Sequence, residues 1–254
     1  MYRDSYLLWN PSTNESILLP NPELRQTYED AFCSTYGFGY DSISDDYKIL
    51  KIDNDGGNDF RPHSNILALK SGSWRKIDKH SCAFHNGLRP DDSLAFVCGA
   101  FHWISKDDLS NYFVILFNIS NEVYGEISLP DGICNIPYMR LIKRVISVID
   151  EMLCAYCTCQ HIDGSTFKLW VMKDYGIKES WTQLFTIQER AACLYYIIPE
   201  CMFADGDVLL MYSKGFSFGF RTFKGPFKLF PIYHGDHQRG FVYTESLIPL
   251  KLLI

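Results

Sequence analysis

The sequence predicts an all-β fold, and within that class a kelch-like β-propeller of antiparallel four-stranded blades that lacks its N-terminal strands. The first observation is a succession of short apolar runs, bounded by turn-forming residues, along all 254 residues. The second is an aromatic content of 15%, which favours strands. The third is a hairpin pattern that returns about every 50 residues, the period of four-stranded propeller blades. A twisted two-sheet sandwich of the same hairpins is the alternative fold.

The first predicted element is a hairpin over residues 6–20. An apolar run at 6–9 is followed by the polar stretch 10–14 and by a second apolar stretch that ends at Pro20. Because Pro11 fixes φ, and because Asn10 and Ser12 can bond their own backbone, the chain must turn back at this point. No later segment shows helical periodicity over three turns.

Further strand pairs are expected along the chain, separated by polar turns that contain Gly, Asp, Asn or Ser. They are 35–40 with 47–52, the two halves of 65–78 around a turn at 71–73, 94–98 with 100–105, the two halves of 112–130 around a turn at 120–121, 140–149 with 152–159, 167–172 with 180–187, 197–203 with 207–212, 216–223 with 227–233, and a last strand in 240–250. The longest predicted loops are 21–34, 53–64, 79–93 and 234–239.

The echoing hairpins define the repeat. Aligned on Trp9, Leu69, Phe117, Trp170 and Phe220, they are separated by 60, 48, 53 and 50 residues, with one further strand pair between successive anchors. The first hairpin lacks the pair that precedes every later one, which leaves about four and a half blades. Either a strand at 241–248 completes a small ring, or N-terminal sequence is missing; the second is favoured because a hairpin begins with almost nothing ahead of it.

Composition limits the partners. The net charge is −6 and the isoelectric point about 5.6, so the chain has no overall basic field that would draw it to nucleic acid or to an anionic membrane. Nine cysteines and a charged N-terminus without a secretory signal indicate a reduced intracellular protein, in the cytoplasm, the nucleus or both. No apolar run approaches the ~20 residues of a membrane-spanning helix.

Residues that could bind a metal or take part in catalysis do not form a recognisable motif in the sequence. Cys154, Cys157 and Cys159 are metal-like, but strand alternation places Cys154 on the opposite face and no second Cys or His pair has zinc spacing. His102 is interpreted as a structural strand histidine. The paired aspartates at 45–46, 91–92 and 107–108 are interpreted as turn residues. We therefore expect no catalytic residues, no metal and no cofactor.

Binding is expected on loops that a rigid β scaffold presents. The predicted partner-contact segment is Lys79–Ser93, with four candidate residues: His80, His85, Arg89 and Asp91. The alternative for this segment is a merely exposed loop. The five tryptophans recur at strand positions and are expected to pack between blades: Trp9, Trp74, Trp103, Trp170 and Trp181.

Short segments spread along nearly the whole chain resemble the F-box-associated domain of plant F-box proteins. They are Leu-Trp-Asn-Pro-Ser-Thr at 8–13, Tyr-Gly-Phe-Gly-Tyr-Asp at 36–41, Asp-Asp-Tyr-Lys-Ile-Leu at 45–50, Gly-Ala-Phe-His-Trp at 99–103, Leu-Trp-Val-Met-Lys-Asp-Tyr-Gly at 169–176 with Glu-Ser-Trp-Thr at 179–182, and Val-Tyr-Thr-Glu-Ser-Leu at 242–247. Their order and spacing match that family, which includes S-locus F-box proteins of self-incompatibility and F-box/kelch-repeat proteins.

The resemblance implies one domain over 1–254 that selects substrates for an SCF-type E3 ubiquitin ligase, in which an N-terminal F-box binds a Skp-type adaptor. The six residues before Leu7 cannot hold the helices of an F-box. Adaptor binding is therefore expected only if missing N-terminal sequence supplies one, and the partner expected of this domain is the protein substrate. The alternatives are a carbohydrate- or small-ligand-binding propeller and a hydrolase on the same scaffold.

Overall fold

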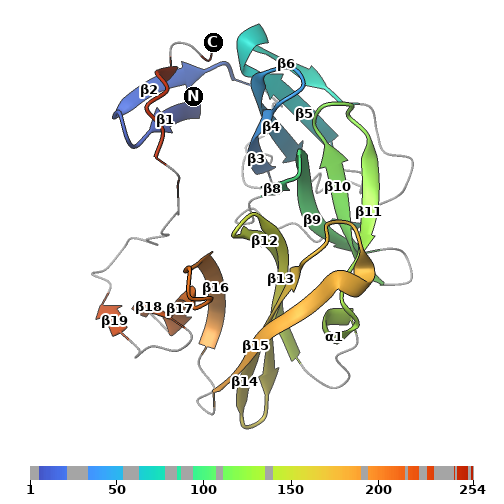
Figure 1. Cartoon of the computed structure of the whole chain (residues 1–254), viewed down its shortest axis with the longest axis vertical. Helices are drawn as coiled ribbons and strands as arrows, with labels where there is room; N and C mark the ends of the chain where they lie inside the picture. The colour runs from blue at the N-terminus through green and yellow to red at the C-terminus, as the bar shows by residue number, and fades with distance from the viewer. Residues whose placement is uncertain are drawn as a thin grey trace. The chain divides into compact units, whose positions relative to one another are not determined.

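The computed structural model describes residues 6–21, 34–53, 63–77, 85–86, 94–106, 111–134, 140–189, 194–214, 217–222, 228–231, 243, 245–250 and 253. The chain divides into two compact units, one formed by Met1–Ile127 with Thr244–Ile254 and the other by Ser128–Tyr243. Figure 1 shows the strands of the sheets in each unit. Within the described residues, no helix is long and apolar enough to cross a membrane.

The predicted first hairpin is confirmed. Strands β1 (Tyr6–Asn10) and β2 (Glu15–Leu19) pair antiparallel, with Tyr6 opposite Leu19 and Asn10 opposite Glu15. They form a sheet of two strands. The turn forms as the sequence suggested, because the Ser12 N–H donates to Asn10 Oδ1 at 2.9 Å.

The first unit holds two larger sheets, each built from strands that follow one another in sequence. One has the order β3-β4-β5-β6, and the other has the order β11-β10-β9-β7 with β8 also paired to β9. Their strands are β3 (Ser34–Asp41), β4 (Asp46–Asp53), β5 (His63–Ala68), β6 (Ser73–Lys76), β7 (His85–Asn86), β8 (Ala95–Val97), β9 (Ala100–Lys106), β10 (Tyr112–Asn118) and β11 (Tyr124–Ser128).

The second unit holds two four-stranded antiparallel sheets, in the orders β12-β13-β14-β15 and β16-β17-β18-β19. Its elements are α1 (Asp131–Cys134), β12 (Arg140–Ile149), β13 (Met152–His161), β14 (Gly164–Met172), η3 (Lys178–Ser180), β15 (Trp181–Glu189), β16 (Leu194–Met202), β17 (Val208–Lys214), β18 (Ser217–Thr222) and β19 (Lys228–Pro231). The predicted all-β propeller fold of four-stranded antiparallel blades is confirmed.

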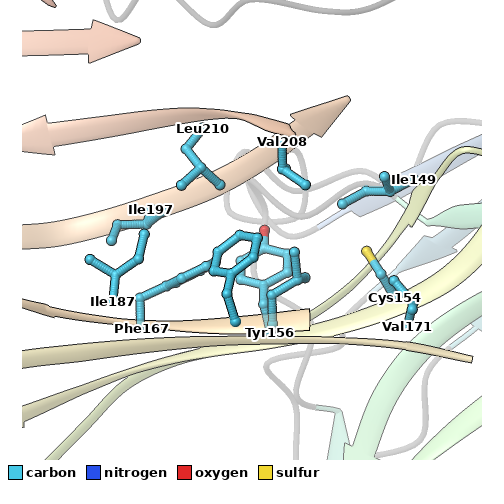
Figure 2. Packing of buried hydrophobic residues seen from close by; sticks show 11 residues of the cluster. Ile149, Cys154, Tyr156, Phe167, Val171, Ile187, Ile197, Val208 and Leu210 are labelled. Carbon is cyan, nitrogen blue, oxygen red and sulfur yellow. The ribbon is translucent and has the colours of Figure 1, made fainter. Parts of the chain in front are cut away.

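Neighbouring sheets bury their facing side chains against each other. In the second unit, Tyr156 and Phe167 of one sheet pack against Ile197 and Leu210 of the next, and Figure 2 shows these side chains meeting between the two layers. In the first unit, the cluster between the sheets is formed by Leu50, Ile52, Ile66, Ile77, Leu94, Phe101, Trp103, Ile115, Phe117 and Ile119. Alternating strand residues thus supply the facing sides of these neighbouring sheets with apolar contacts.

Three hairpins of the first unit turn with the same geometry. In each, an Asn or Asp side-chain oxygen accepts a hydrogen bond from the N–H two residues later, and the residue four places on has positive φ. The acceptors are Asn10, Asp41 and Asn118, at 2.9, 3.0 and 3.0 Å, and the positive-φ residues are Asn14 (55°), Asp45 (51°) and Glu122 (59°). The predicted echo between the hairpins at residues 8–20 and 116–130 therefore has a structural basis.

The predicted last strand is not present in the described part of residues 240–250. Residues 245–249 have no strand pairing, because side chains of the first hairpin occupy their backbone groups. Asn10 Nδ2 donates to the carbonyls of Ser246 and Ile248 at 2.9 and 3.3 Å, and the Leu250 N–H donates to Glu15 Oε2 at 3.0 Å. Pro249 lacks an N–H and cannot donate a ladder hydrogen bond at its own position.

One repeat anchor also lies outside a strand. The strand containing Leu67 ends at Ala68, and Leu69 begins a short 3-10 turn, η2 (Leu69–Ser71). The Lys70 N–H donates to the Asp46 carboxylate at 3.2 Å, which draws the backbone away from the ladder. Leu69 is nevertheless fully buried, so its apolar character reflects the core and not a strand position.

Candidate protein-docking surface

Strand β3 alternates aromatic residues and glycines over Tyr36–Tyr40. A Cβ built on Gly37 would lie 2.6 Å from the ring of Phe101, and one built on Gly39 would lie 2.5 Å from the ring of Phe96. Only glycine leaves room for these rings, so the sheet β3–β6 can approach its neighbour closely. Because successive side chains of a strand point to opposite faces, the aromatic residues between the glycines all point to the other face.

That other face exposes aromatic rings. Phe38 is 45% exposed and Tyr40 is 42% exposed. The Tyr47 ring of β4 stacks on Phe38 with 5.2 Å between centroids and 11° between planes, and its centroid lies 5.0 Å from that of Tyr40. We call Phe38, Tyr40 and Tyr47 the aromatic face. Exposed clusters of this kind are typical of binding surfaces, where aromatic side chains often contribute most of the affinity.

Hydrogen bonds hold the end of the aromatic face that lies next to the β3–β4 turn. Tyr40 Oη donates to Asp45 Oδ1 at 2.5 Å, and this bond raises the pKa of Tyr40. Lys70 forms an ion pair with the same carboxylate, with 3.1 Å between Nζ and Oδ2. These bonds connect the Tyr40 hydroxyl to the β3–β4 turn and to Lys70.

A buried ion pair lies beneath the β3–β4 turn. Lys48 Nζ is 2.6 Å from Asp41 Oδ2, and both residues are buried. Ser120 Oγ donates to Asp41 Oδ1 at 2.5 Å, while Lys48 also donates to the Ile119 carbonyl at 2.9 Å. Burial by itself would raise the pKa of Asp41, but the bonds from Lys48 and Ser120 hold that pKa well below its usual range. The network joins the β3–β4 turn to the β10–β11 turn.

Strand β3 contacts the first hairpin near its N-terminal end, through Tyr36. The hydroxyl oxygens of Tyr6 and Tyr36 lie 2.6 Å apart, and the ring centroids are 5.4 Å apart. Leu8 and Leu19 pack against a buried cluster that also contacts Tyr47. The first hairpin and the aromatic face therefore lie on the same face of the sheet β3–β6.

The four predicted contact residues are untested by the structure. His80, Arg89 and Asp91 lie outside the described residues, and His85 is described only through its backbone, which pairs with Lys106 in β7. The proposal for these residues stays a prediction. The sequence did not predict the aromatic face. The alternation of aromatic residues and glycines at 36–40 predicts a strand, but it does not say which of the two faces a neighbouring sheet covers.

Two residues that the sequence analysis considered for catalysis or metal binding, His102 and Cys154, are part of the core. His102 is fully buried, its Nδ1 lies 3.3 Å from the Ala95 carbonyl, and burial lowers its pKa to about 4. The interpretation of His102 as a structural histidine is confirmed. Burial raises the pKa of the Cys154 thiol to about 12, which keeps it protonated within a hydrophobic cluster. Across the described ranges, no group of three or more His, Cys, Asp or Glu residues could hold a metal ion.

Two tryptophans bind backbone carbonyls at equivalent places. Trp74 Nε1 donates to the Pro20 carbonyl at 2.7 Å across 54 residues of sequence, and Trp181 Nε1 donates to the Ser128 carbonyl at 2.9 Å across 53. Pro20 follows β2, and Ser128 ends β11. Each bond therefore spans about the length of the predicted repeat of roughly 50 residues.

The other three tryptophans differ from one another. Trp103 is buried in the cluster between two sheets, as predicted. Trp170 is also buried, but its ring lies against α1, 2.8 Å from a Cβ built on Gly132. Trp9 is 54% exposed and donates to Asn14 Oδ1 at 3.3 Å, so the expectation of packing between sheets is not met at this position in the described structure.

Comparison with known proteins places these features in a family. The model of the F-box associated beta propeller domain matches residues 1–220. The F-box protein CPR1 of Arabidopsis thaliana is 29% identical over 204 residues, which cover 72% of this chain and 48% of CPR1. The F-box/kelch-repeat protein At3g23880 of the same plant is 26% identical over 213 residues, which cover 83% of this chain and 54% of that protein.

The matched proteins are longer than this chain, which spans about half the length of the relatives it matches. Among solved structures, TolB from Acinetobacter baumannii has a TM-score of 0.46 and 11% identity, covering 89% of this chain and 51% of TolB.

Proposed function

This chain belongs to the F-box associated beta propeller domain family, and from that premise we propose that it is the target-recognition domain of an F-box protein. The observation that supports a binding role is the aromatic face, in which Phe38 and Tyr40 expose almost half of their surface. Exposed aromatic side chains held in one position supply large contact area at low entropic cost. The expected partner is therefore a folded or extended protein segment with apolar side chains.

Within a ubiquitin ligase of the SCF type, such a domain would hold the substrate while a separate conjugating enzyme transfers ubiquitin. The domain itself would perform no chemistry, and its contribution would be proximity between the substrate and the enzyme. A Skp-type adaptor would be bound by an F-box in the longer protein. We place this function in the cytoplasm or nucleus, where such ligases would meet their substrates.

The test is affinity capture of target proteins from plant extract with the tagged chain. The variant Phe38→Ala should lose the captured target, because it removes a central ring of the aromatic face. Phe203→Ala is the matched control, since Phe203 is 44% exposed and Phe38 is 45% exposed. The control should capture the target as the unchanged chain does.

Two results would overturn the proposal. One is that no protein target is recovered while a glycan array gives saturable binding, which would favour the carbohydrate-binding alternative. The other is that the two variants behave identically, which would show that the aromatic face does not hold the target. A stoichiometric complex between this chain and a Skp-type adaptor would contradict the separate expectation that the described domain binds only the target.

A further inference from the structure

We propose that residues 245–250, with Leu253, are a releasable strap that the first hairpin holds by its backbone, and that release of this strap opens apolar surface next to the aromatic face. The inference rests on the proposed protein-binding function and adds a way of regulating it. Its basis is a set of hydrogen bonds between the hairpin and the strap, which are far apart in sequence. Figure 1 shows the strap, coloured red, beside β1 and β2.

The hairpin binds the strap through backbone groups of the strap. Asn10 Nδ2 donates to the carbonyls of Ser246 and Ile248, at 2.9 and 3.3 Å. The Ser246 N–H donates to Ser12 Oγ at 3.2 Å. These bonds run from side chains of the hairpin to the backbone of the strap, so they hold an extended segment in place without a ladder between two strands.

The amide of Asn10 has two separate tasks. Its Oδ1 accepts from the Ser12 N–H and caps the turn, while its Nδ2 donates to the strap. Asp41 caps the β3–β4 turn in the same way, accepting from the Ile43 N–H at 3.0 Å. A carboxylate has no hydrogen to donate. An aspartate in place of Asn10 would therefore keep the turn and lose the bonds to the strap.

Few side chains anchor the strap. Leu250 is 5% exposed, and its N–H donates to Glu15 Oε2 at 3.0 Å. By contrast, Leu247 is 82% exposed and Ile248 is 46% exposed. Segments with few buried apolar contacts open at a lower free energy than the core strands do. The strap can therefore detach while the sheets of the first unit stay folded.

The strap covers apolar surface that adjoins the aromatic face. Leu253, whose N–H donates to the Leu250 carbonyl at 3.0 Å, packs against the same buried cluster as Tyr47. The Tyr47 ring in turn stacks on Phe38. Withdrawing Leu250 and Leu253 would expose apolar area next to the aromatic rings, where a target could bury it. The bound strap is thus an autoinhibitory contact.

The first test measures hydrogen exchange in the full chain. Asn10→Asp should speed exchange of the backbone amides in residues 245–250 at least about tenfold, because it removes the donor to two strap carbonyls and keeps the turn. Asn118→Asp is the matched control, since Asn118 caps the equivalent β10–β11 turn through the Ser120 N–H. Equal exchange of the strap in both variants, or the same acceleration along the whole chain, would overturn the inference.

The second test offers the strap as a separate peptide. The probe is a fluorescent synthetic peptide of residues 244–254, and the receptor is the full chain with Leu250→Ser and Leu253→Ser, whose own strap lacks its anchors. Fluorescence anisotropy should show saturable binding at least about tenfold tighter than to the unchanged chain, where the tethered strap competes at high effective concentration. Adding Asn10→Asp to the receptor should weaken binding at least about tenfold.

The control peptide carries the same two serine substitutions and should not bind. Absence of saturable binding by the unaltered peptide, or equal binding with and without Asn10→Asp in the receptor, would overturn the inference. Far-ultraviolet circular dichroism and thermal unfolding establish that each variant is folded.

Target capture separates the inference from the proposed function. The chain with Leu250→Ser and Leu253→Ser should capture at least about twofold more target from plant extract than the unchanged chain does. Equal or weaker capture would overturn the autoinhibitory role of the strap and leave the proposed function standing. If no variant captures a target, the proposed function falls, while hydrogen exchange and peptide binding still decide whether the strap is releasable.

Discussion

Lys48 Nζ lies 2.6 Å from Asp41 Oδ2 in a buried ion pair that joins two hairpin turns of neighbouring sheets. The lysine also donates to the Ile119 carbonyl, and Ser120 Oγ donates to the same aspartate. Asp41 ends β3, Lys48 lies in β4 just after the turn, and Ile119 and Ser120 lie in the β10–β11 turn, so the network fixes two chain reversals against each other beside the aromatic face. Its stability and the shape of the proposed docking surface are therefore linked.

Replacing Lys48 should destabilise the fold strongly. Lys48→Met leaves the Asp41 carboxylate buried without its cation, and the free energy of unfolding should fall by about 3–5 kcal/mol. Denaturant unfolding measures the change. Lys70→Met is the control, because Lys70 and its partner Asp45 are exposed, and it should change stability little. Equal effects of the two variants would show that the buried pair has no special role.

Mild acid should destabilise the protein through His102. Its pKa is lowered to about 4 in the folded chain, against an ordinary value of 6.5, so the unfolded chain binds the proton first as pH falls. Stability should be complete above pH 6.5, decline from there to about pH 4, and be lower by about 2 kcal/mol at pH 5. Urea unfolding at several pH values measures this slope, and His102→Asn should flatten it; an unchanged slope in that variant would assign the dependence elsewhere.

A further loss of stability is expected in stronger acid. The pKa of Asp41 is lowered in the fold, so its contribution is complete above the ordinary value of 3.8 and is lost as pH falls below it. Asp41→Asn should remove this acid-dependent part of the unfolding curve below pH 3.8 while lowering stability at neutral pH. The same urea series checks it, and persistence of the steep acid loss in the variant would contradict the assignment.

Adding one methyl group to β3 should disturb the contact between two sheets. In Gly39→Ala the new Cβ would meet the Phe96 ring at 2.5 Å, and the overpacking should lower stability by about 1–3 kcal/mol. The double variant Gly39→Ala with Phe96→Leu should recover part of that loss, because leucine is smaller than the ring. A double-mutant cycle by thermal unfolding measures the coupling, and strict additivity would count against this contact.

The repeated indole bonds should contribute modestly and similarly. Trp74→Phe and Trp181→Phe each remove the donor to a backbone carbonyl, at Pro20 and Ser128, and should each lower stability by about 0.5–1.5 kcal/mol. Trp9→Phe is the control, because its bond to Asn14 lies within one exposed hairpin and should matter less. A loss for Trp9→Phe as large as for the other two would argue against a structural role of the repeat.

Local patterns in the sequence were sufficient for the strands and turns. Asn10, Pro11 and Ser12 specify their turn through contacts within a few residues, and the hairpins at 34–53 and 140–161 formed where alternation and turn residues placed them. The repeat was visible because each blade needs the same strand pattern. The one predicted strand that failed, in residues 240–250, looked apolar and extended in sequence, but its backbone bonds go to Asn10 and Glu15, far away along the chain.

The sequence by itself therefore determined the fold class, the hairpin turns and the period of the repeat, because these depend on interactions between residues close in the chain. Only the tertiary structure decided which face of β3 is covered, that Asp41 meets Lys48 and Ser120, and that Tyr47 stacks on Phe38 beside Tyr40. Those outcomes depend on which sheet packs against which, and alternation along a strand presents two faces without saying which one a neighbour will bury.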